Sequence, residues 1–356
     1  MEYTRLGNSG LKISKVIFGC MSFGTPEWQE WVLDEAAALP LLKHAYDVGL
    51  NTWDTADIYS NGQSEEIIGK ALKKYEIPRN RIVILTKCYF GVAEDGTQPP
   101  IAAASVNDGL MVNRTGLSRK HILDAVDQSV KRLGTYIDVL QIHRLDRDTP
   151  REEIMRALND VVDSGKVRYI GASSMAAWEF QTLQNIADKH GWHKFISMQN
   201  YYNLLYREEE REMIPYCRDT GVGLVPWSPL ARGALARPFT DRSTLREKSD
   251  SGLTRLIRSK ESEIDKQVNE RVQEIAKKHG VSMTTIATAW CLSKDKVNPI
   301  IGLSSKERID QAVESVQFAS SGKLTAEDIA YLEEGYAPKE LIGLLTGSQS
   351  YATHRG

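Results

Sequence analysis

Apolar runs and helical patterns alternate along most of the chain. Eight short runs rich in aliphatic residues are candidate strands, at 16–18, 51–54, 82–85, 137–142, 167–172, 195–199, 222–227 and 299–301. Between them, apolar residues recur every three or four positions, as in Ile122, Ala125, Val126 and Leu133, which share one helix face. Helices are accordingly expected near 34–49, 64–72, 122–133, 154–162, 176–190, 208–220, 263–279, 282–293, 306–318 and 325–336.

Several polar clusters mark where helices begin. Thr149, followed by Pro150 and by Glu152, predicts a capping box. Ser64, which precedes two glutamates, is expected to open another helix. The charged run Arg207–Glu212 is interpreted as the solvated start of a further helix.

Repeated strand–helix units favour parallel strands joined by right-handed crossovers. The closed arrangement is a (β/α)₈ TIM barrel formed as one α/β domain over residues 1–356, and an N-terminal β-hairpin at 1–14 would close its bottom. An open doubly wound sheet is the structural alternative, but it usually carries a glycine-rich turn after its first strand and the chain has no G-x-G-x-x-G. Substrate and cofactor loops are expected at the C-terminal rim, at 88–117, 228–262 and 337–356.

Composition narrows the classes of partner. The net charge is −2 and no basic stripe occurs, so nucleic acid is not expected. No apolar run approaches the roughly 18 residues that span a bilayer, and no signal peptide is apparent, so we expect a cytoplasmic protein without a membrane partner. The four cysteines lie far apart and suggest neither zinc nor disulfides; no metal is expected. Without heptads, a monomer is the default.

Four ionisable residues fall at or just after predicted strand ends. They are Asp54, Tyr59, Lys87 and His143, from three neighbouring strands. Carbonyl reduction adds hydride to carbon, so the oxygen gains negative charge and needs a proton. A tyrosine, protonated at neutral pH, can supply it. Lys87 is expected to lower the pKa of Tyr59, Asp54 to keep Lys87 charged, and His143 to orient the substrate oxygen.

The chain resembles the aldo-keto reductases over nearly its whole length, closest to their aryl-alcohol-dehydrogenase-like branch. The matching stretches are Gly49–Tyr59, Leu85–Lys87, Val139–His143, Gly165–Ser174, Gln199–Asn200 and Pro226–Leu230. The family has a (β/α)₈ barrel and binds NADP(H) without a Rossmann fold. The resemblance implies Tyr59 as the acid, Lys87 and Asp54 as the residues that adjust its pKa, and His143 as the donor that orients the substrate.

The resemblance also implies a set of cofactor-binding positions. They are Met21, Asp54, Ser173, Ser174, Gln199, Trp227, Ser228, Leu230, Ala231, Arg232, Gly233, Gly302, Ser304, Arg308 and Gln311. Ser173, Ser174 and Gln199 match positions that hold the nicotinamide carboxamide, and Trp227 matches the residue that stacks on its ring. Arg308 and Ser304 suit the 2′-phosphate, which favours NADPH over NADH. Many members have Asn where Ser174 and Ala312 stand.

The expected reaction is NADPH-dependent reduction of an aldehyde or ketone, reversible as alcohol oxidation. Trp28, Tyr89 and Phe90 lie in expected rim loops and could line a pocket for an aromatic substrate, although such residues also pack beneath loops. The substrate would be an aryl or aliphatic aldehyde, or a polyketide intermediate. One alternative is an NADPH-binding regulatory subunit of the channel-β type, but those proteins carry Asn in place of His143. Another is a barrel hydrolase with paired carboxylates, which the four-residue set does not favour.

Overall fold

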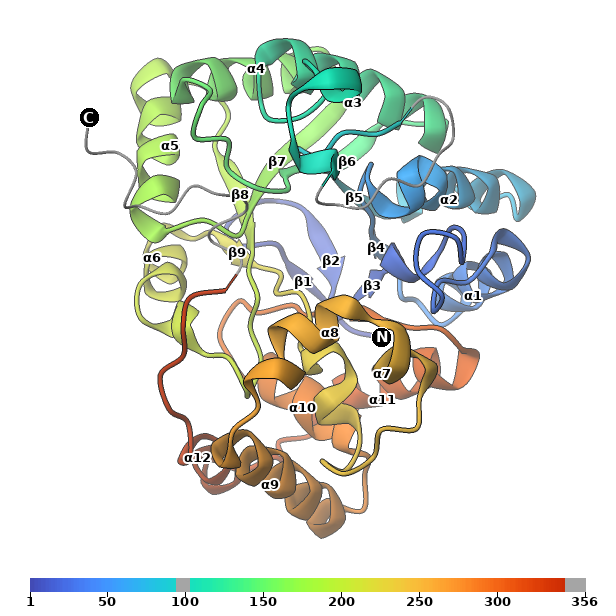
Figure 1. The fold of residues 1–356 in the computed structure, drawn as a ribbon, viewed down its shortest axis with the longest axis vertical. Coiled ribbons are helices and arrows are strands. Elements are labelled where there is room, and N and C mark those ends of the chain that lie inside the picture. Colours follow the sequence, from blue (N-terminus) through green and yellow to red (C-terminus); the bar gives the residue numbers. More distant parts are fainter. Residues whose placement is uncertain (94–102, 343–356) are drawn as a thin grey trace.

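Eight parallel strands form one sheet that closes on itself. The computed structural model describes residues 1–93 and 103–342 (Figure 1). The sheet order is β10-β3-β4-β5-β6-β7-β8-β9. The strands are β3 (Ile17–Gly19), β4 (Thr52–Asp54), β5 (Val83–Cys88), β6 (Ile137–Ile142), β7 (Val167–Ser173), β8 (Phe195–Gln199), β9 (Gly223–Leu224) and β10 (Ile300–Gly302). Parallel bridges from Leu224 to Val297 and from Trp227 to Ile300 join the two sheet edges. The fold is therefore the predicted (β/α)₈ barrel, not an open sheet.

Helices surround the barrel because their apolar faces pack against the outside of the strands. The helices that follow the barrel strands in turn are α1 (Glu35–Asp47), α2 (Gln63–Lys74), α3 (Arg119–Leu133), α4 (Arg151–Asp163), α5 (Ala177–His190), α6 (Met213–Thr220), α10 (Met283–Leu292) and, after β10, α11 (Lys306–Ser320). Two others, α9 (Glu263–His279) and α12 (Ala326–Glu333), pack against each other. On α3, Ile122, Ala125, Val126 and Leu133 are buried, as their spacing predicts.

The N-terminal hairpin closes the end of the barrel where the strands begin. It consists of β1 (Tyr3–Arg5) and β2 (Lys12–Ser14). Leu6 and Ile13 pack with the inward side chains Ile17, Val83, Leu85, Val139, Val225 and Ile300. Gly7 has φ +58°, and a Cβ there would lie 2.4 Å from the carbonyl oxygen of Gly221, so only glycine fits this approach.

Two predicted helix starts are wrong in detail. Helix α4 begins at Arg151 with Pro150 at its N-cap and no side-chain capping bond. Thr149 instead donates its hydroxyl to Asp146 Oδ2 at 2.6 Å. Helix α2 begins one residue before Ser64, whose hydroxyl donates to the carbonyl oxygen of Cys20 at 2.9 Å. In both cases another partner, Asp146 just upstream of Thr149 and the distant Cys20 for Ser64, takes the hydroxyl that the local pattern assigned to a cap.

The interpretation of Arg207–Glu212 as a solvated helix start is also wrong. Glu208 and Glu209 are buried, and α6 begins only at Met213. Glu208 accepts the hydroxyl of Tyr336 at 2.5 Å, and Glu209 accepts the amide of Asn200 at 2.8 Å. Burial raises the pKa of Glu209 to about 8. This run therefore anchors the chain that follows β8.

The expected rim loops have more structure than their sequence suggested. Segment 228–262 contains two short helices, α7 (Leu245–Ser249) and α8 (Ser251–Leu256). Residues 94–102 of the expected loop 88–117, and 343–356 of the expected loop 337–356, lie outside the described residues.

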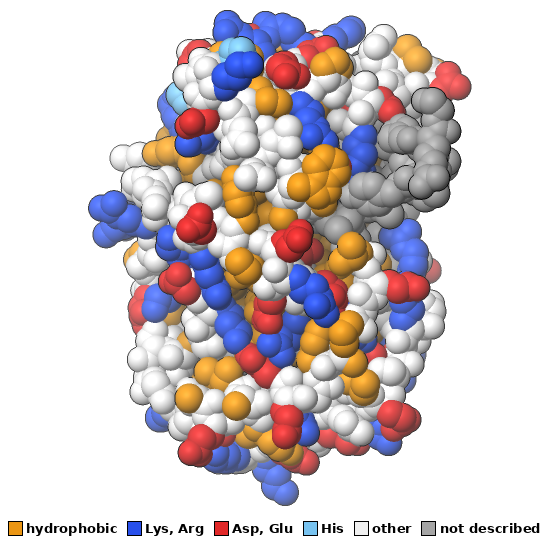
Figure 2. Space-filling view, turned by 90° about the vertical axis from the view of Figure 1, so that its left-hand side faces the viewer, with side chains coloured by type: hydrophobic (Ala, Val, Ile, Leu, Met, Phe, Trp, Pro, Cys, Tyr) orange, Lys and Arg blue, Asp and Glu red, His pale blue; other side chains and the backbone are white. Residues whose placement is uncertain are grey.

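The described surface gives no sign of a membrane-spanning or metal-binding element. Among the described residues, no helix is both long and apolar enough to span a membrane, and no three His, Cys, Asp or Glu side chains gather as a metal site. Figure 2 shows a face on which acidic and basic side chains are interspersed and hydrophobic ones lie among them in small groups.

Candidate active site

Three neighbouring strands bring the four predicted ionisable side chains together at the C-terminal end of the barrel. Asp54 is the last residue of β4, Lys87 lies one residue before the end of β5, and His143 directly follows β6. Tyr59 begins a 3-10 turn over Tyr59–Gly62 that follows β4. All four side chains are buried. Parallel pairing of β4 with β5 and of β5 with β6 sets their relative positions.

Lys87 is the centre of this cluster. Its Nζ donates to Asp54 Oδ2 at 2.7 Å, to the carbonyl oxygen of Thr55 at 2.8 Å and to the hydroxyl of Tyr59 at 3.1 Å. These three acceptors match the three protons of an ammonium group. Because the Lys87 side chain is 0% exposed, water does not compete for these bonds. The lysine is thus held in one position with its charge directed at both Asp54 and Tyr59.

Two amide side chains complete the surroundings of Asp54. Its Oδ1 accepts from Gln141 Nε2 at 3.1 Å and from Gln199 Nε2 at 2.9 Å. Gln199 Nε2 also donates to Gln141 Oε1 at 3.0 Å. Sequence reasoning missed Gln141, although it lies two residues before His143 in a matching stretch. The carboxylate therefore has ion-pair and hydrogen-bond partners on both oxygens, as a buried charge requires.

Burial and charge act in opposite directions on Tyr59 and Lys87. Burial raises the pKa of Tyr59 above its usual value, although the charge of Lys87 acts to lower it. Lys87 thus acts on the pKa of Tyr59 in the expected direction, but desolvation of the phenolate outweighs the ammonium, so the net pKa is raised. Burial lowers the pKa of Lys87, but Asp54 and Tyr59 more than compensate, so the net pKa is raised. At neutral pH, Tyr59 is thus a phenol beside a charged lysine.

His143 lies against two aromatic rings. Its ring meets that of Tyr59 edge-on at 5.9 Å between centroids and that of Phe90 at 4.9 Å. Burial, reinforced by the charges of Arg144 and Lys87, lowers the pKa of His143 well below its usual value. Nδ1 is buried and has no hydrogen-bond partner among the described residues. The imidazole is therefore neutral at physiological pH, with one N–H to donate.

The aromatic residues expected at the rim pack beside Tyr59. Trp28 and Phe90 belong to a buried cluster with Tyr59, and Tyr89 and Met21 pack against it half-buried. The rings of Trp28 and Tyr59 lie 6.1 Å apart. The structure thus places all three candidate pocket residues, and Met21, on the Tyr59 side of the site.

The residues expected at the nicotinamide lie on β7, on β8 and after β9. Ser173 Oγ donates to the carbonyl oxygen of Gln199 at 2.8 Å, and Trp227 Nε1 donates to Ser174 Oγ at 3.2 Å. Trp227 also stacks on Tyr201, at 4.5 Å between centroids and 28° between planes. Ser174 has φ +47°, in the left-handed region that Asn tolerates better than Ser. Ser173, Ser174 and Gln199 are buried, while Trp227 is half-buried.

Two arginines bind one carboxylate beyond this region. Arg232 Nη1 donates to both oxygens of Asp250, at 2.9 and 2.8 Å, and Arg246 Nε donates to Asp250 Oδ2 at 2.9 Å. Burial lowers the pKa of Arg246, and the charges of Arg232 and Arg308 lower it further. Arg232 Nε is buried without a partner among the described residues. One carboxylate does not neutralise two guanidiniums, so the group retains positive charge.

Sequence reasoning missed Arg246 and Asp250, whose only local signal is a spacing of four residues. The Arg246 guanidinium also lies 4.3 Å from the centroid of the Trp31 ring, in the buried aromatic cluster. This contact ties α7 to the Tyr59 side of the site. The two regions therefore meet across the rim of the barrel.

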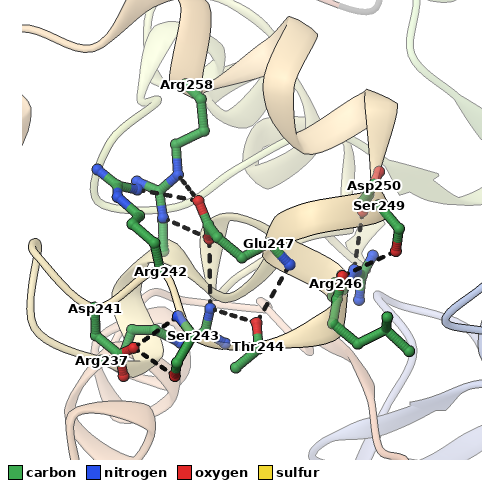
Figure 3. A network of polar contacts seen from close by, with 12 residues as sticks. Arg237, Asp241, Arg242, Ser243, Thr244, Arg246, Glu247, Ser249, Asp250 and Arg258 are labelled. Carbon is green, nitrogen blue, oxygen red and sulfur yellow. Dashed lines mark hydrogen bonds and ion pairs between the residues drawn. The ribbon is translucent and has the colours of Figure 1, made fainter.

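A second carboxylate, that of Glu247, pairs with other arginines of segment 228–262. Figure 3 shows Arg242 and Arg258 directed at Glu247, with Arg246 and Asp250 on the neighbouring turn. Glu247 also pairs with Arg237 at 3.4 Å, and its side chain is only 6% exposed. Segment 228–262 is therefore held by buried ion pairs rather than by a large apolar core of its own.

The remaining predicted cofactor residues lie at the start of segment 228–262 and around the start of α11. Ser228, Ala231, Arg232 and Gly233 all have positive φ, so the chain turns sharply where Leu230 also lies. Arg308 is exposed and its Nη1 donates to Ser304 Oγ at 2.7 Å, next to Gly302 at the end of β10. Gln311 is half-buried one turn later, while Ala312 is buried in the core.

Comparison with known proteins decides the family. The model of the aldo/keto reductase family matches residues 15–337. The chain belongs to the aldo/keto reductase family. Two relatives are similar over almost their whole length. Versiconal hemiacetal acetate reductase of Aspergillus parasiticus is 68% identical over 96% of this chain and 98% of its own. A putative aryl-alcohol dehydrogenase of Schizosaccharomyces pombe is 56% identical over 96% of this chain and 97% of its own.

Membership makes this chain an NAD(P)-dependent oxidoreductase of the aryl-alcohol dehydrogenase type that reduces carbonyl compounds. The residues present fit a bound dinucleotide on structural grounds. The arginines around Asp250 carry unneutralised charge, and Arg232 Nε lacks a partner among the described residues, as suits a phosphate ligand. In this reductase, Trp227 keeps part of its ring surface accessible next to Ser174, as suits a flat heterocycle.

Proposed function

We propose that this reductase uses NADPH to reduce an aryl aldehyde or a related carbonyl compound, with Tyr59 as the proton donor. The observation that carries the proposal is the bonding of one buried ammonium, Lys87, to Asp54 and to Tyr59 at the same time. NADPH, when bound, supplies the hydride. Every other step falls to the side chains of the protein.

Tyr59 gives its phenolic proton to the carbonyl oxygen as negative charge develops there. Because burial raises its pKa, Tyr59 holds this proton at neutral pH until a stronger base forms beside it. Lys87, whose Nζ lies 3.1 Å from the phenol oxygen, stabilises the tyrosinate that remains. Asp54 keeps Lys87 charged and fixed, and the neutral imidazole of His143 donates to the same carbonyl oxygen and orients it.

The proposed cofactor contacts extend from this pocket toward α11. Ser173, Ser174 and Gln199 would hold the nicotinamide carboxamide, with Trp227 against the ring. Arg232 and Arg246 would bind the pyrophosphate, with the turn from Ser228 to Gly233 around it. Arg308 and Ser304 would bind the 2′-phosphate, which is the reason to propose NADPH over NADH, and Gln311 would face the adenine.

The substrate proposal rests on the aromatic wall and on the relatives. Trp28, Tyr89 and Phe90 offer flat apolar surfaces beside Tyr59, which suits an aromatic carbonyl compound. The relatives' names refer to an aryl alcohol and to a hemiacetal. A hemiacetal is a masked aldehyde, so ring opening yields the same reacting group. An aromatic aldehyde, free or masked as a hemiacetal, is therefore the proposed class.

The test is NADPH oxidation at 340 nm against aromatic aldehydes, aliphatic aldehydes and a cyclic hemiacetal, with NADH in parallel. We expect turnover with NADPH, fastest for the aromatic compounds. Tight NADPH binding without turnover of any carbonyl compound would contradict the proposal and favour a regulatory binding subunit.

A further inference from the structure

A partly buried arginine, for which the described part of the chain offers no carboxylate partner, lies next to His143. Arg144 donates from Nη1 to the carbonyl oxygen of His143 at 2.5 Å. Its Nε is buried and has no hydrogen-bond partner among the described residues. In the described part of the chain no aspartate or glutamate forms an ion pair with it. Within the described ranges, the guanidinium is therefore held by one backbone oxygen, and no carboxylate there compensates its charge.

Several other partly buried arginines form ion pairs with carboxylates. Each of several has a carboxylate within 3.1 Å: Arg79 with Asp138, Arg132 with Glu65, Arg147 with Glu179 and Arg207 with Glu210 and Glu333. Removing a guanidinium from water is costly unless an anion or several acceptors replace the water. Arg144 thus differs from these four arginines, and it directly follows His143.

The surroundings of Arg144 are the proposed substrate pocket and its rim. The ionisable groups that affect it are the phenols of Tyr59 and Tyr89 and the guanidinium of Arg255 in α8. Burial lowers the pKa of Arg144 to about 10, the two phenols act in the opposite direction, and Arg255 lowers it further. The charge of Arg255 thus acts on the same place as that of Arg144, so an anion entering here would be attracted by both.

We propose that Arg144 binds an anionic oxygen of the substrate, and that the enzyme therefore prefers aromatic carbonyl compounds bearing a carboxylate or an ionised phenol. This inference rests on the proposed function, because it assigns a substrate class to the same pocket. His143 orients the carbonyl oxygen at one end of the molecule, Tyr89 and Phe90 flank its aromatic body, and Arg144 receives its anionic group. A guanidinium suits this role because its planar N–H groups match the oxygens of a carboxylate.

The test compares charged and neutral substrates of nearly the same shape. The kcat/KM values of 3- and 4-carboxybenzaldehyde are measured beside those of their methyl esters, with 4-hydroxybenzaldehyde beside 4-methoxybenzaldehyde to distinguish carboxylate from phenolate. We expect wild type to prefer at least one anionic compound over its neutral partner by about tenfold or more. Arg144→Met should remove this preference and still reduce the esters, while Arg144→Lys should keep part of it.

A matched control separates recognition from general damage. Arg151 is another partly buried arginine, stacked on Trp178 outside the pocket, so Arg151→Met should leave the charged-to-neutral ratio unchanged. An unchanged ratio in Arg144→Met would overturn the inference. An equal fall in kcat/KM for charged and neutral substrates would also overturn it, because it would mean that Arg144 only positions His143 by binding the carbonyl oxygen of that residue.

Binding provides a readout that does not need turnover. Terephthalate, a dicarboxylate that cannot be reduced in this way, should bind wild type at least about tenfold more tightly than it binds Arg144→Met, measured by calorimetry on the enzyme with NADP⁺. Equal affinity would overturn the inference even if every aldehyde were inert. Turnover of the neutral esters tests the proposed function separately, so the two failures are distinguishable.

Discussion

The two halves of the site are built in different ways. Asp54, Lys87 and His143 lie at the ends of neighbouring strands, where sheet hydrogen bonds fix the backbone on both sides. Segment 228–262 instead consists of turns and two short helices tied by arginine–carboxylate pairs around Glu247 and Asp250. Proton transfer needs reacting atoms held within a few tenths of an ångström, which strands provide. Binding a long, flexible dinucleotide instead needs a segment that can open and close around it. We call segment 228–262 the clamp.

The largest effect is expected on the rigid half. Lys87→Met should lower kcat about a hundredfold or more, because tyrosinate would form without its ammonium. It should also reduce the free energy of unfolding by about 3 kcal/mol, since the buried Asp54 carboxylate loses its ion pair. Urea unfolding and NADPH oxidation measure the two effects. The double variant Asp54→Asn/Lys87→Met should regain stability but not turnover; regained turnover would show that the pair is only structural.

A smaller effect on activity is expected at the start of α11, where the 2′-phosphate end of the cofactor would lie beyond the clamp. Arg308→Ala should raise the KM for NADPH about tenfold and leave that for NADH nearly unchanged, because only NADPH carries a 2′-phosphate. Lys306→Ala, an exposed cation at the start of the same helix, is the control and should change neither value. Equal losses for both cofactors in Arg308→Ala would mean that the 2′-phosphate lies elsewhere.

The smallest effect is expected inside the clamp itself. Glu247→Gln should weaken NADPH binding severalfold while kcat at saturating NADPH stays within about twofold, because Arg237, Arg242 and Arg258 lose their shared anion while the strand ends are untouched. Glu263→Gln, which changes an exposed glutamate of α9, should have no effect. A fall in kcat as large as that of Lys87→Met would erase the distinction between the two halves.

The barrel and the strand-end residues could be predicted because both depend on local pattern. Strand-length apolar runs and helical spacing identify the elements, and the ends of parallel strands meet at one rim. That is why Asp54, Lys87 and His143 could be brought together from sequence. The net pKa of Tyr59 could not be predicted, because it depends on how completely the pocket excludes water.

The clamp escaped prediction because long-range ion pairs shape it. Arg246 and Asp250 look like ordinary surface residues of a polar segment, and only the fold brings Arg232 and Trp31 to them. The run at Arg207–Glu212 is charged throughout, yet Glu208 and Glu209 are buried by partners elsewhere in the chain. Charge patterns alone do not report such burial.

The division of labour between the two halves can be tested in one variant, Tyr59→Phe. Quenching of tryptophan fluorescence gives the Kd for NADPH, and stopped-flow mixing of the NADPH complex with an aromatic aldehyde gives the rate of a single turnover. We predict a Kd within about twofold of wild type and a single-turnover rate at least about a hundredfold lower. A single-turnover rate equal to that of wild type would remove Tyr59 as the acid and contradict the proposed mechanism.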